Sequence, residues 1–371
     1  MRPAAGTRVN GKMVGPIVRI TDVDVAPIVM PKEDPSWRFA LAATPDSHGF
    51  LVRIRTDDAH EGTGYTTAVP HLGAPADRVL ADLQMLATTL RGGQVPSLSS
   101  IAGLGGSNQA RCGIDVALHD LEARRLGVPL HRVLGGAVRR EVSLLRILAL
   151  KAPADVAANA RRLVDEGYAY LKIKLDGDTD TDVARIAAVR GAVGAAVHLT
   201  VDANQSYNAS DAIRAAARFD RYGVELFEQP VPERDFDGLA EVARAIDIPV
   251  EADESAQSLE DVFQLAARGA VDSISLKLPK LGGITAARAA AAICAAAGVR
   301  CRVGATVGSR IIAAAALHFA AATPNIDYAC ELAEFARLRD DPALGLPIEH
   351  GLLRVPDDVG LGVRVREGVR A

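Results

Sequence analysis

The feature that most constrains the fold is an alternation of short apolar runs with alanine-rich helical stretches over the later part of the chain. Eight runs have the length of a buried strand, and all but the last precede a helical pattern: 142–149, 170–175, 197–202, 225–228, 249–253, 273–278, 299–303 and 327–330. Repeated βα units build parallel sheets, and eight within about 200 residues are typical of a (β/α)8, TIM-like barrel. A doubly wound open sheet is the alternative, but no G-x-G-x-x-G motif follows the first run. We therefore predict an α/β fold centred on a barrel.

The first third of the chain has a different pattern. Residues 17–25 and 50–56 alternate like strands, whereas 75–90 and 108–125 have helical patterns, the second of which Gly127 closes. Residues 16–137 are therefore predicted to form a separate α+β unit. The opening 1–15, with its Gly, Pro, Arg and Asn residues, is predicted to be a disordered tail.

Two lysines stand at alternate positions of the run Tyr170-Leu-Lys-Ile-Lys-Leu175. Side chains two apart in a strand share a face, so Lys172 and Lys174 lie together. Mutual repulsion and partial burial both lower the pKa of a lysine, towards a value at which it can act as a base near neutral pH. The alternative is an edge strand with solvated lysines.

Acidic residues end three successive predicted strands, and lysines end the strands on either side. Barrel chemistry lies at these carboxyl ends, so the acids are expected to converge. A divalent cation would balance them, and an all-oxygen donor set favours Mg²⁺, with Mn²⁺ as a second possibility. Any one acid alone could instead be a helix N-cap. The strand ends read Asp202-Ala-Asn204, Glu228-Gln-Pro, Glu251-Ala-Asp-Glu-Ser255 and Lys277-Leu-Pro-Lys-Leu-Gly-Gly283.

These motifs, in this order, resemble the enolase superfamily, in its muconate lactonizing enzyme/mandelate racemase branch. The similarity extends over nearly the whole chain, and the helix from Ala110 through Gly136 is similar to the segment joining the cap and the barrel of that branch. The resemblance implies that 16–137 is a capping domain and 138–345 a catalytic barrel. It also implies that 346–371 returns to the cap.

The resemblance further implies a metal site. Its Mg²⁺ ligands would be Asp202, Glu228 and Asp253. Glu251 remains an alternative ligand, because strand alternation puts it on the same face as Asp253. Asn204 would support the metal side of the pocket.

The resemblance also implies roles for the lysines. Lys174 and Lys277 would be acid/base groups on opposite faces of the substrate. Lys172 would lower the pKa of Lys174 and help to polarise the substrate carboxylate, and Glu254 would hold Lys277.

The implied reaction is removal of a proton next to a carboxylate, with the cation stabilising the charge that develops. Two opposed lysines favour racemisation or epimerisation, and they also permit cycloisomerisation or dehydration. The residues after the seventh run, from 303 to 310, include no histidine that could act as a base. The two-lysine subgroup of the family therefore fits better than the lysine/histidine subgroup. The remote alternative is a non-catalytic, metal-stabilised barrel.

Substrate selection is expected from two segments. The first is the polar loop 27–49, with the chain's only tryptophan, Trp37, and with Phe39; it would be a lid over an apolar ligand or a plain surface excursion. The second is the end of the eighth run, where Glu331 either enters the pocket or is a solvated loop acid.

The composition of the chain argues against nucleic acid and membrane as partners. A net charge of −4 gives no basic footprint for nucleic acid, and no apolar run reaches membrane-spanning length. The four cysteines show no CxxC pair and are expected to be buried thiols in a reducing cytoplasm. We expect a cytoplasmic homo-oligomer whose partner is a small-molecule carboxylate substrate.

Overall fold

The computed structural model describes residues 7–9, 12–14, 17–69, 73–304 and 307–368. Within the predicted N-terminal tail, Thr7–Val9 (β1) and Lys12–Val14 (β2) pair as a short antiparallel hairpin. The rest of that tail lies outside the described residues. No helix in the described ranges is both long and apolar enough to cross a membrane.

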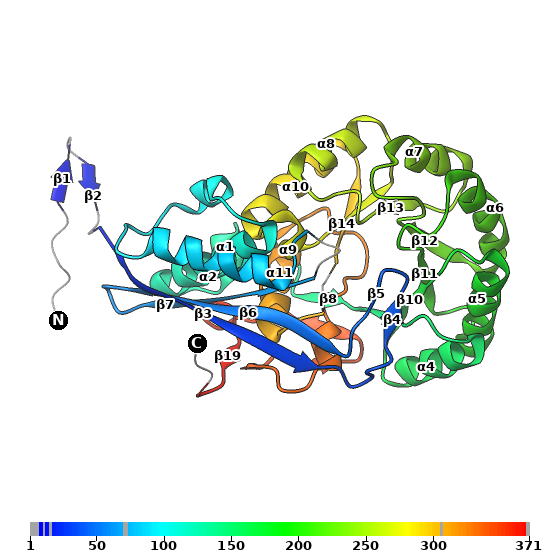
Figure 1. Cartoon of the computed structure of the whole chain (residues 1–371), viewed down its shortest axis with the longest axis horizontal. Coiled ribbons are helices and arrows are strands. Elements are labelled where there is room, and N and C mark those ends of the chain that lie inside the picture. Colours follow the sequence, from blue (N-terminus) through cyan, green and yellow to red (C-terminus); the bar gives the residue numbers. More distant parts are fainter. Residues whose placement is uncertain (1–6, 10–11, 15–16, 70–72, 305–306, 369–371) are drawn as a thin grey trace.

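The barrel prediction is confirmed by a parallel sheet whose strands follow one another in chain order (Figure 1). Its strands are β9 (Leu145–Leu148), β10 (Tyr170–Lys174), β11 (His198–Asp202), β12 (Val224–Glu228), β13 (Val250–Ala252), β14 (Ser273–Leu276) and β15 (Arg300–Val303). The helices that follow these strands are α4 (Pro153–Asp165), α5 (Thr179–Val193), α6 (Ala209–Phe219), α7 (Phe236–Ala245), α8 (Leu259–Ala267), α9 (Leu278–Leu281), α10 (Ile284–Ala297) and α11 (Arg310–Ala322). Helices α4 to α8 form the outer arc in Figure 1, whereas α9, α10 and α11 lie on the side of the N-terminal unit. Within the residues that the structure describes, short 3₁₀ segments also lie at Leu98–Gly103, Asp220–Tyr222 and Glu334–Arg337.

The predicted first and eighth strands differ from the observed ones. The run 142–149 divides at Leu144 into β8 (Glu141–Ser143), which pairs outside the barrel, and β9. The run 327–330 forms only isolated bridges rather than a regular strand. It still links the sheet's two edges, because Cys330 O accepts from Leu145 N at 2.9 Å and Glu331 N donates to Val303 O at 3.0 Å.

The α+β unit is built on the antiparallel sheet β3 (Ile20–Pro31), β6 (Asp46–Thr56) and β7 (Glu61–Thr67). Helices α1 (Ala76–Leu90) and α2 (Asn108–Leu126), both predicted, cover one face of this sheet. Alternation along β6 sends Val52 into that helix-covered core and Leu51 into the main core of the barrel.

The predicted loop 27–49 is too long at both ends. Strands β3 and β6 stay paired as far as Pro31 and Asp46, so only 32–45 lies outside the main pairing. That remainder carries a small hairpin of β4 (Arg38–Phe39) and β5 (Ala42–Ala43). Pro27 and Pro31 made the end of this strand resemble a loop in the sequence. Both prolines are tolerated because β3 is an edge strand.

The C-terminal segment contacts the cap helices as well as the barrel. Its strands are β16 (Ala343–Leu344), β17 (Ile348–Glu349), β18 (Leu352–Arg354) and β19 (Arg364–Val365), of which β18 pairs with β8. Leu361 N donates to Asp120 of α2 at 2.9 Å, and Gly360 O accepts from Leu130 in the short helix α3 (Leu130–Val133). The exact domain boundaries at 137 and 345 stay predictions.

A carboxylate of the capping domain accepts hydrogen bonds at the N-terminus of a barrel helix. Asp115 on α2 is fully buried and accepts from Ile284 N at 2.6 Å and from the Thr285 hydroxyl at 2.5 Å, so it caps α10 from outside that helix. A Cβ on Gly283 would lie 2.5 Å from the Asp115 side chain, and its φ of 116° is in a region that other residues rarely adopt. The cap and the barrel are therefore joined at a helix N-terminus.

Replacing Asp115 by alanine should lower the free energy of unfolding by roughly 1–3 kcal/mol, because buried donors of α10 lose their acceptor. Chemical denaturation measures this loss. The matched control is Asp178→Ala, which removes the cap of α5 that accepts from Thr181 N at the surface. Equal losses in the two variants would contradict a special role for the joint.

A buried histidine pair lies where α3 meets α11. His318 Nδ1 is 3.3 Å from the backbone N of His131, which must donate, and His318 Nε2 is 3.2 Å from Leu361 O. These partners require neutral His318 with its proton on Nε2. Burial, together with neighbouring His131, lowers the pKa of His318 to about 4.

Acid should therefore destabilise the fold through His318. The unfolded state takes up a proton near pH 6.5 and the folded state only near pH 4, so this stability is complete above pH 6.5 and disappears as the pH falls towards 4. The full effect is about 3 kcal/mol. Thermal unfolding of wild type and His318→Gln measured from pH 7.5 to 4.5 tests this, since the variant should lose less stability across the range. Identical pH profiles would refute it.

Candidate active site

The three predicted metal-binding carboxylates converge at the carboxyl ends of adjacent strands. Asp202 and Glu228 are the last residues of β11 and β12 and are paired in register, and Asp253 directly follows β13. All three side chains are buried. Strand ends of a parallel sheet meet at one edge, and this explains how residues far apart in the chain come together.

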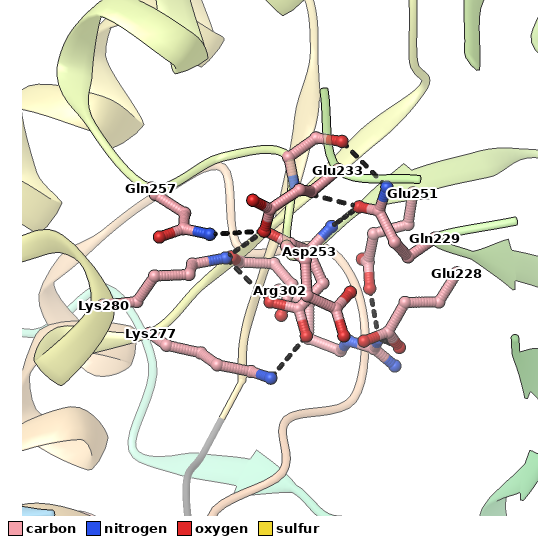
Figure 2. Close-up of polar contacts among 12 residues, drawn as sticks. Glu228, Gln229, Glu233, Glu251, Asp253, Gln257, Lys277, Lys280 and Arg302 are labelled. Carbon is pink, nitrogen blue, oxygen red and sulfur yellow. Dashed lines mark hydrogen bonds and ion pairs between the residues drawn. The ribbon is translucent and has the colours of Figure 1, made fainter. Parts of the chain in front are cut away.

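The predicted catalytic lysines contact these acids from two sides. Lys174, at the end of β10, donates to Asp202 Oδ2 at 2.5 Å and to Asn204 Oδ1 at 2.8 Å. Lys277, which follows β14, pairs with Asp253. In Figure 2 the side chain of Lys277 reaches Asp253 from the side opposite Glu228.

Lys172 is more buried than Lys174 and Lys277, and its ion-pair partners are carboxylates. Its Nζ is 2.8 Å from Glu228 Oε2 and 3.2 Å from Asp202 Oδ2, and it also pairs with Glu331. The expected lowering of lysine pKa is wrong here. Burial alone would lower the pKa of Lys172, but the neighbouring carboxylates raise it well above its ordinary value. The same balance, dominated by Asp253, raises the pKa of Lys277.

The two predicted supporting residues, Asn204 and Glu254, lie within the same hydrogen-bond network. The backbone N of Asn204 donates to Asp202 Oδ1 at 2.9 Å, and its Oδ1 accepts from Lys174 Nζ; its support of the metal side stays a prediction. Glu254 does not hold Lys277 by a hydrogen bond; its Oε1 accepts from Asn204 Nδ2 at 2.9 Å. Burial, reinforced by Asp253 and Asp202, raises the pKa of Glu254 to about 7.

Glu251 lies beside Glu228, because the NH2 atom of Arg302 pairs with both carboxylates. Its Oε2 accepts from the Ser273 hydroxyl at 2.8 Å, and its Oε1 pairs with Arg302. Each carboxylate oxygen of Glu251 therefore has a partner, Ser273 for one and Arg302 for the other. Of the two acids that alternation left open, Asp253 is the one that pairs with Lys277 and Lys280. Its role as a metal ligand stays a prediction.

Three residues of the site had no role in the sequence reasoning. Lys280 is fully buried and donates to Asp253 Oδ1 at 2.8 Å and to Ser275 O at 2.8 Å. Arg302 lies between Glu228 and Glu251 at the floor (Figure 2). Gln229 bridges β12 to the loop after β13. A charged residue inside the apolar run 299–303 was the available signal for Arg302.

The two predicted specificity segments also reach this region. Glu331 is buried and ion-paired, so it is not a solvated loop acid; Lys172 and Arg302 lower its pKa to about 2 against the effect of burial. The Phe39 ring lies 5.0 Å from Lys174 Nζ, and the Trp37 ring is 5.7 Å from that of Phe39. The loop 32–45 therefore covers the Lys174 side of the site.

The donor set suits a hard divalent cation. Among the described residues, no group of three or more His, Cys, Asp or Glu is arranged to hold a metal ion, and ammonium groups pair with Asp202 and Asp253. Glu228 Oε1 and Glu254 Oε2 are nevertheless buried without a hydrogen-bond partner. Buried carboxylate oxygens need a proton, a donor or a cation, and oxygen-only ligands favour Mg²⁺.

Family models match both parts of the chain. The model described as "Mandelate racemase / muconate lactonizing enzyme, N-terminal domain" matches residues 22–135, and "Enolase C-terminal domain-like" matches 155–369. The chain belongs to the mandelate racemase/muconate lactonizing enzyme family of the enolase superfamily.

Similar proteins of this family are isomerases, and so is this chain. Muconate cycloisomerase 1 of Rhodococcus opacus is 37% identical over 261 residues, 69% of either chain. The L-Ala-D/L-Glu epimerase of Bacillus subtilis is 33% identical over 321 residues, 83% of this chain and 87% of its own. A dipeptide epimerase from Enterococcus faecalis, solved with Mg and the dipeptide L-Leu-L-Tyr, superimposes with a TM-score of 0.88 at 29% identity, covering 93% of this chain and 99% of that one.

Gln229 should be essential for placing Asp253. Its Oε1 accepts from Asp253 N at 2.9 Å and Ser255 N at 3.1 Å, and its Nε2 donates to the Ser255 hydroxyl and to Val231 O. Leucine at this position has a similar size but leaves those buried groups unpaired, so Gln229→Leu should destabilise the fold by roughly 2–4 kcal/mol. Calorimetric unfolding checks this against Gln264→Leu, which loses one surface bond to Glu260; similar melting temperatures would contradict the bridge.

Proposed function

We propose that this protein is a Mg²⁺-dependent racemase or epimerase that abstracts the α-proton of a small-molecule carboxylate. The observation that supports this most is the placement of two lysines, Lys174 and Lys277, on carboxylates of different strands around one buried acid cluster. An enzyme that inverts a carbon centre needs one group to remove a proton and a second to return one from the other face.

The chain's own residues supply the proton transfers. One of the two Nζ atoms, on Lys174 or Lys277, takes the α-proton, and the other returns a proton to the opposite face. Lys172, buried and cationic, would attract the substrate carboxylate. Asp202, Glu228 and Asp253 would hold the Mg²⁺, with Mn²⁺ as an alternative; when bound, the cation would polarise the substrate carboxylate and stabilise the charge that develops on it.

Cycloisomerisation is the second candidate reaction. It is supported by the 37% identity to muconate cycloisomerase 1 over 69% of this chain, which is similar to the 36% identity over 68% to a hydrophobic dipeptide epimerase of Enterococcus faecalis. In that case one lysine would transfer the proton and the other would act electrostatically. A dehydratase would use the same site, with loss of a β-leaving group.

Loss of either lysine should abolish inversion. Removing a general acid or base typically costs on the order of 10²–10⁴-fold in rate, so Lys174→Ala and Lys277→Ala should each racemise far more slowly than wild type. Each variant should still exchange the α-proton of the one enantiomer whose proton faces the remaining lysine. Both effects are measured by NMR in D2O with Mg²⁺ present, over dipeptides, N-acylated amino acids, sugar acids and muconates.

The product distinguishes the candidate reactions in the same screen. Deuterium in recovered substrate of both configurations indicates a racemase, a lactone indicates a cycloisomerase, and a keto acid indicates a dehydratase. A Lys174→Ala protein that inverts substrate at the wild-type rate would contradict the two-lysine mechanism. Wild type that exchanges no α-proton in any class would favour the non-catalytic alternative.

The cytoplasmic location and the homo-oligomeric state remain part of this proposal. They rest on the sequence and on the family resemblance. Size-exclusion chromatography with light scattering measures the assembly.

A further inference from the structure

Arg302 is an unusual residue to find at the centre of a barrel. It is fully buried on β15, and its NH2 atom pairs with both Glu228 and Glu251 and lies 3.5 Å from Glu331 Oε1. Its other two nitrogens, Nε and NH1, have no hydrogen-bond partner. Burying a guanidinium costs free energy unless acidic partners compensate its charge. The acids that Arg302 contacts therefore indicate its role.

The first consequence concerns which acid is available at the rim. Glu251 on β13 and Asp253 just after it lie two residues apart, so strand alternation alone would let either reach a cation between the strands. Arg302 and Ser273 occupy both oxygens of Glu251, whereas Asp253 is left to the lysines.

The second consequence concerns Glu228. Arg302 and Lys172 both contact its Oε2, and its Oε1 is the buried atom without a hydrogen-bond partner. The guanidinium therefore fixes one oxygen of this carboxylate and leaves the other in position for a cation.

The third consequence concerns charge. The buried cluster contains six acids against five bases: Asp202, Glu228, Glu251, Asp253, Glu254 and Glu331, with Lys172, Lys174, Lys277, Lys280 and Arg302. Arg302 is one of the five bases, so its removal takes one positive charge from the cluster whatever the protonation of the other groups. A cation-loaded site that keeps this charge attracts a substrate carboxylate more strongly.

We propose that Arg302 is a positioning residue that withholds Glu251 from the metal site and keeps the cation-loaded site attractive to a carboxylate. This inference rests on the proposed function, because it concerns the same Mg²⁺ site. Arg302 acts only through Glu228 and Glu251 and touches no reacting atom.

The test is Mg²⁺ binding to the metal-free protein by isothermal titration calorimetry at pH 8.5. Arg302→Met removes the charge at similar length and releases Glu251, so it should bind Mg²⁺ at least tenfold more tightly than wild type. On a substrate from the exchange screen, its KM should rise and its kcat should fall at least a hundredfold. Arg302→Lys keeps the charge and should return the Mg²⁺ affinity most of the way to the wild-type value.

The double variant Arg302→Met/Glu251→Gln is the decisive control. It neutralises the acid that Arg302 held, so its Mg²⁺ affinity should return to within about threefold of wild type, which tests coupling between the two residues. Glu251→Gln alone should bind Mg²⁺ at least threefold more weakly, since the cluster gains one positive charge; this single variant keeps the test informative if Arg302→Met does not fold.

The outcomes separate this inference from the proposed function. A lower melting temperature in Arg302→Met with unchanged Mg²⁺ affinity makes Arg302 purely structural and overturns the inference. A double variant that behaves like Arg302→Met also overturns it. Wild type that binds Mg²⁺ without exchanging α-protons contradicts the proposed function but leaves this inference standing, whereas wild type that binds no Mg²⁺ contradicts both.

Discussion

The organisation of the site depends on balancing buried charge at the carboxyl ends of the strands. Six carboxylates in a space closed to water repel each other strongly, and isolated buried charges cost several kcal/mol each. Cationic side chains on and after the strands from β10 to β15 pair with these acids and offset the repulsion. Lys172, Lys280 and Arg302 are fully enclosed, whereas Lys174 and Lys277 keep some exposure at the rim. The enclosed cations set the positions of the acids, and the rim cations remain accessible to a substrate.

This constraint explains why the sequence located the site but misjudged its electrostatics. Alternating strands and their polar ends follow from local pattern, so Lys172, Lys174, Asp202 and Glu228 could be placed together before the fold was known. The pattern left Glu251 and Asp253 open, and only the family resemblance favoured Asp253. The pKa argument considered two lysines as a pair and expected each to lower the pKa of the other. In the fold each lysine meets carboxylates first, and the pKa of Lys172 is raised. Directions of pKa shifts depend on the full set of neighbours, which local sequence does not contain.

The same distinction holds for the fold. Helices with clear ends were predictable, as for α2, where Gly127 takes the left-handed conformation at the C-cap (φ 66°). The extension of β3 was not, because Pro27 and Pro31 signal a loop unless the strand is known to lie at a sheet edge. Nor was the irregular closure at Cys330, since bridges to Leu144 and between Cys301 and Ile326 depend on the ring as a whole. Arg302 was visible in the sequence as a charge within an apolar run, but its partners come from β12, from β13 and from the segment after Cys330.

The joint between cap and barrel reaches the catalytic groups directly. Asn108, the first residue of α2, donates to Lys280 O at 2.6 Å and to Gln257 O at 3.1 Å, so the cap helix is bound to the turn that carries Lys277 and Lys280. The cap also supplies the loop 32–45, whose Phe39 ring lies against Lys174. Each of the two proposed catalytic lysines thus has a contact that depends on the cap: Lys277 through the backbone after β14 and Lys174 through the loop. A substrate bound between the lysines would therefore be enclosed by elements whose relative position Asp115 and Asn108 determine, which makes the α2–α10 joint part of the geometry of the site.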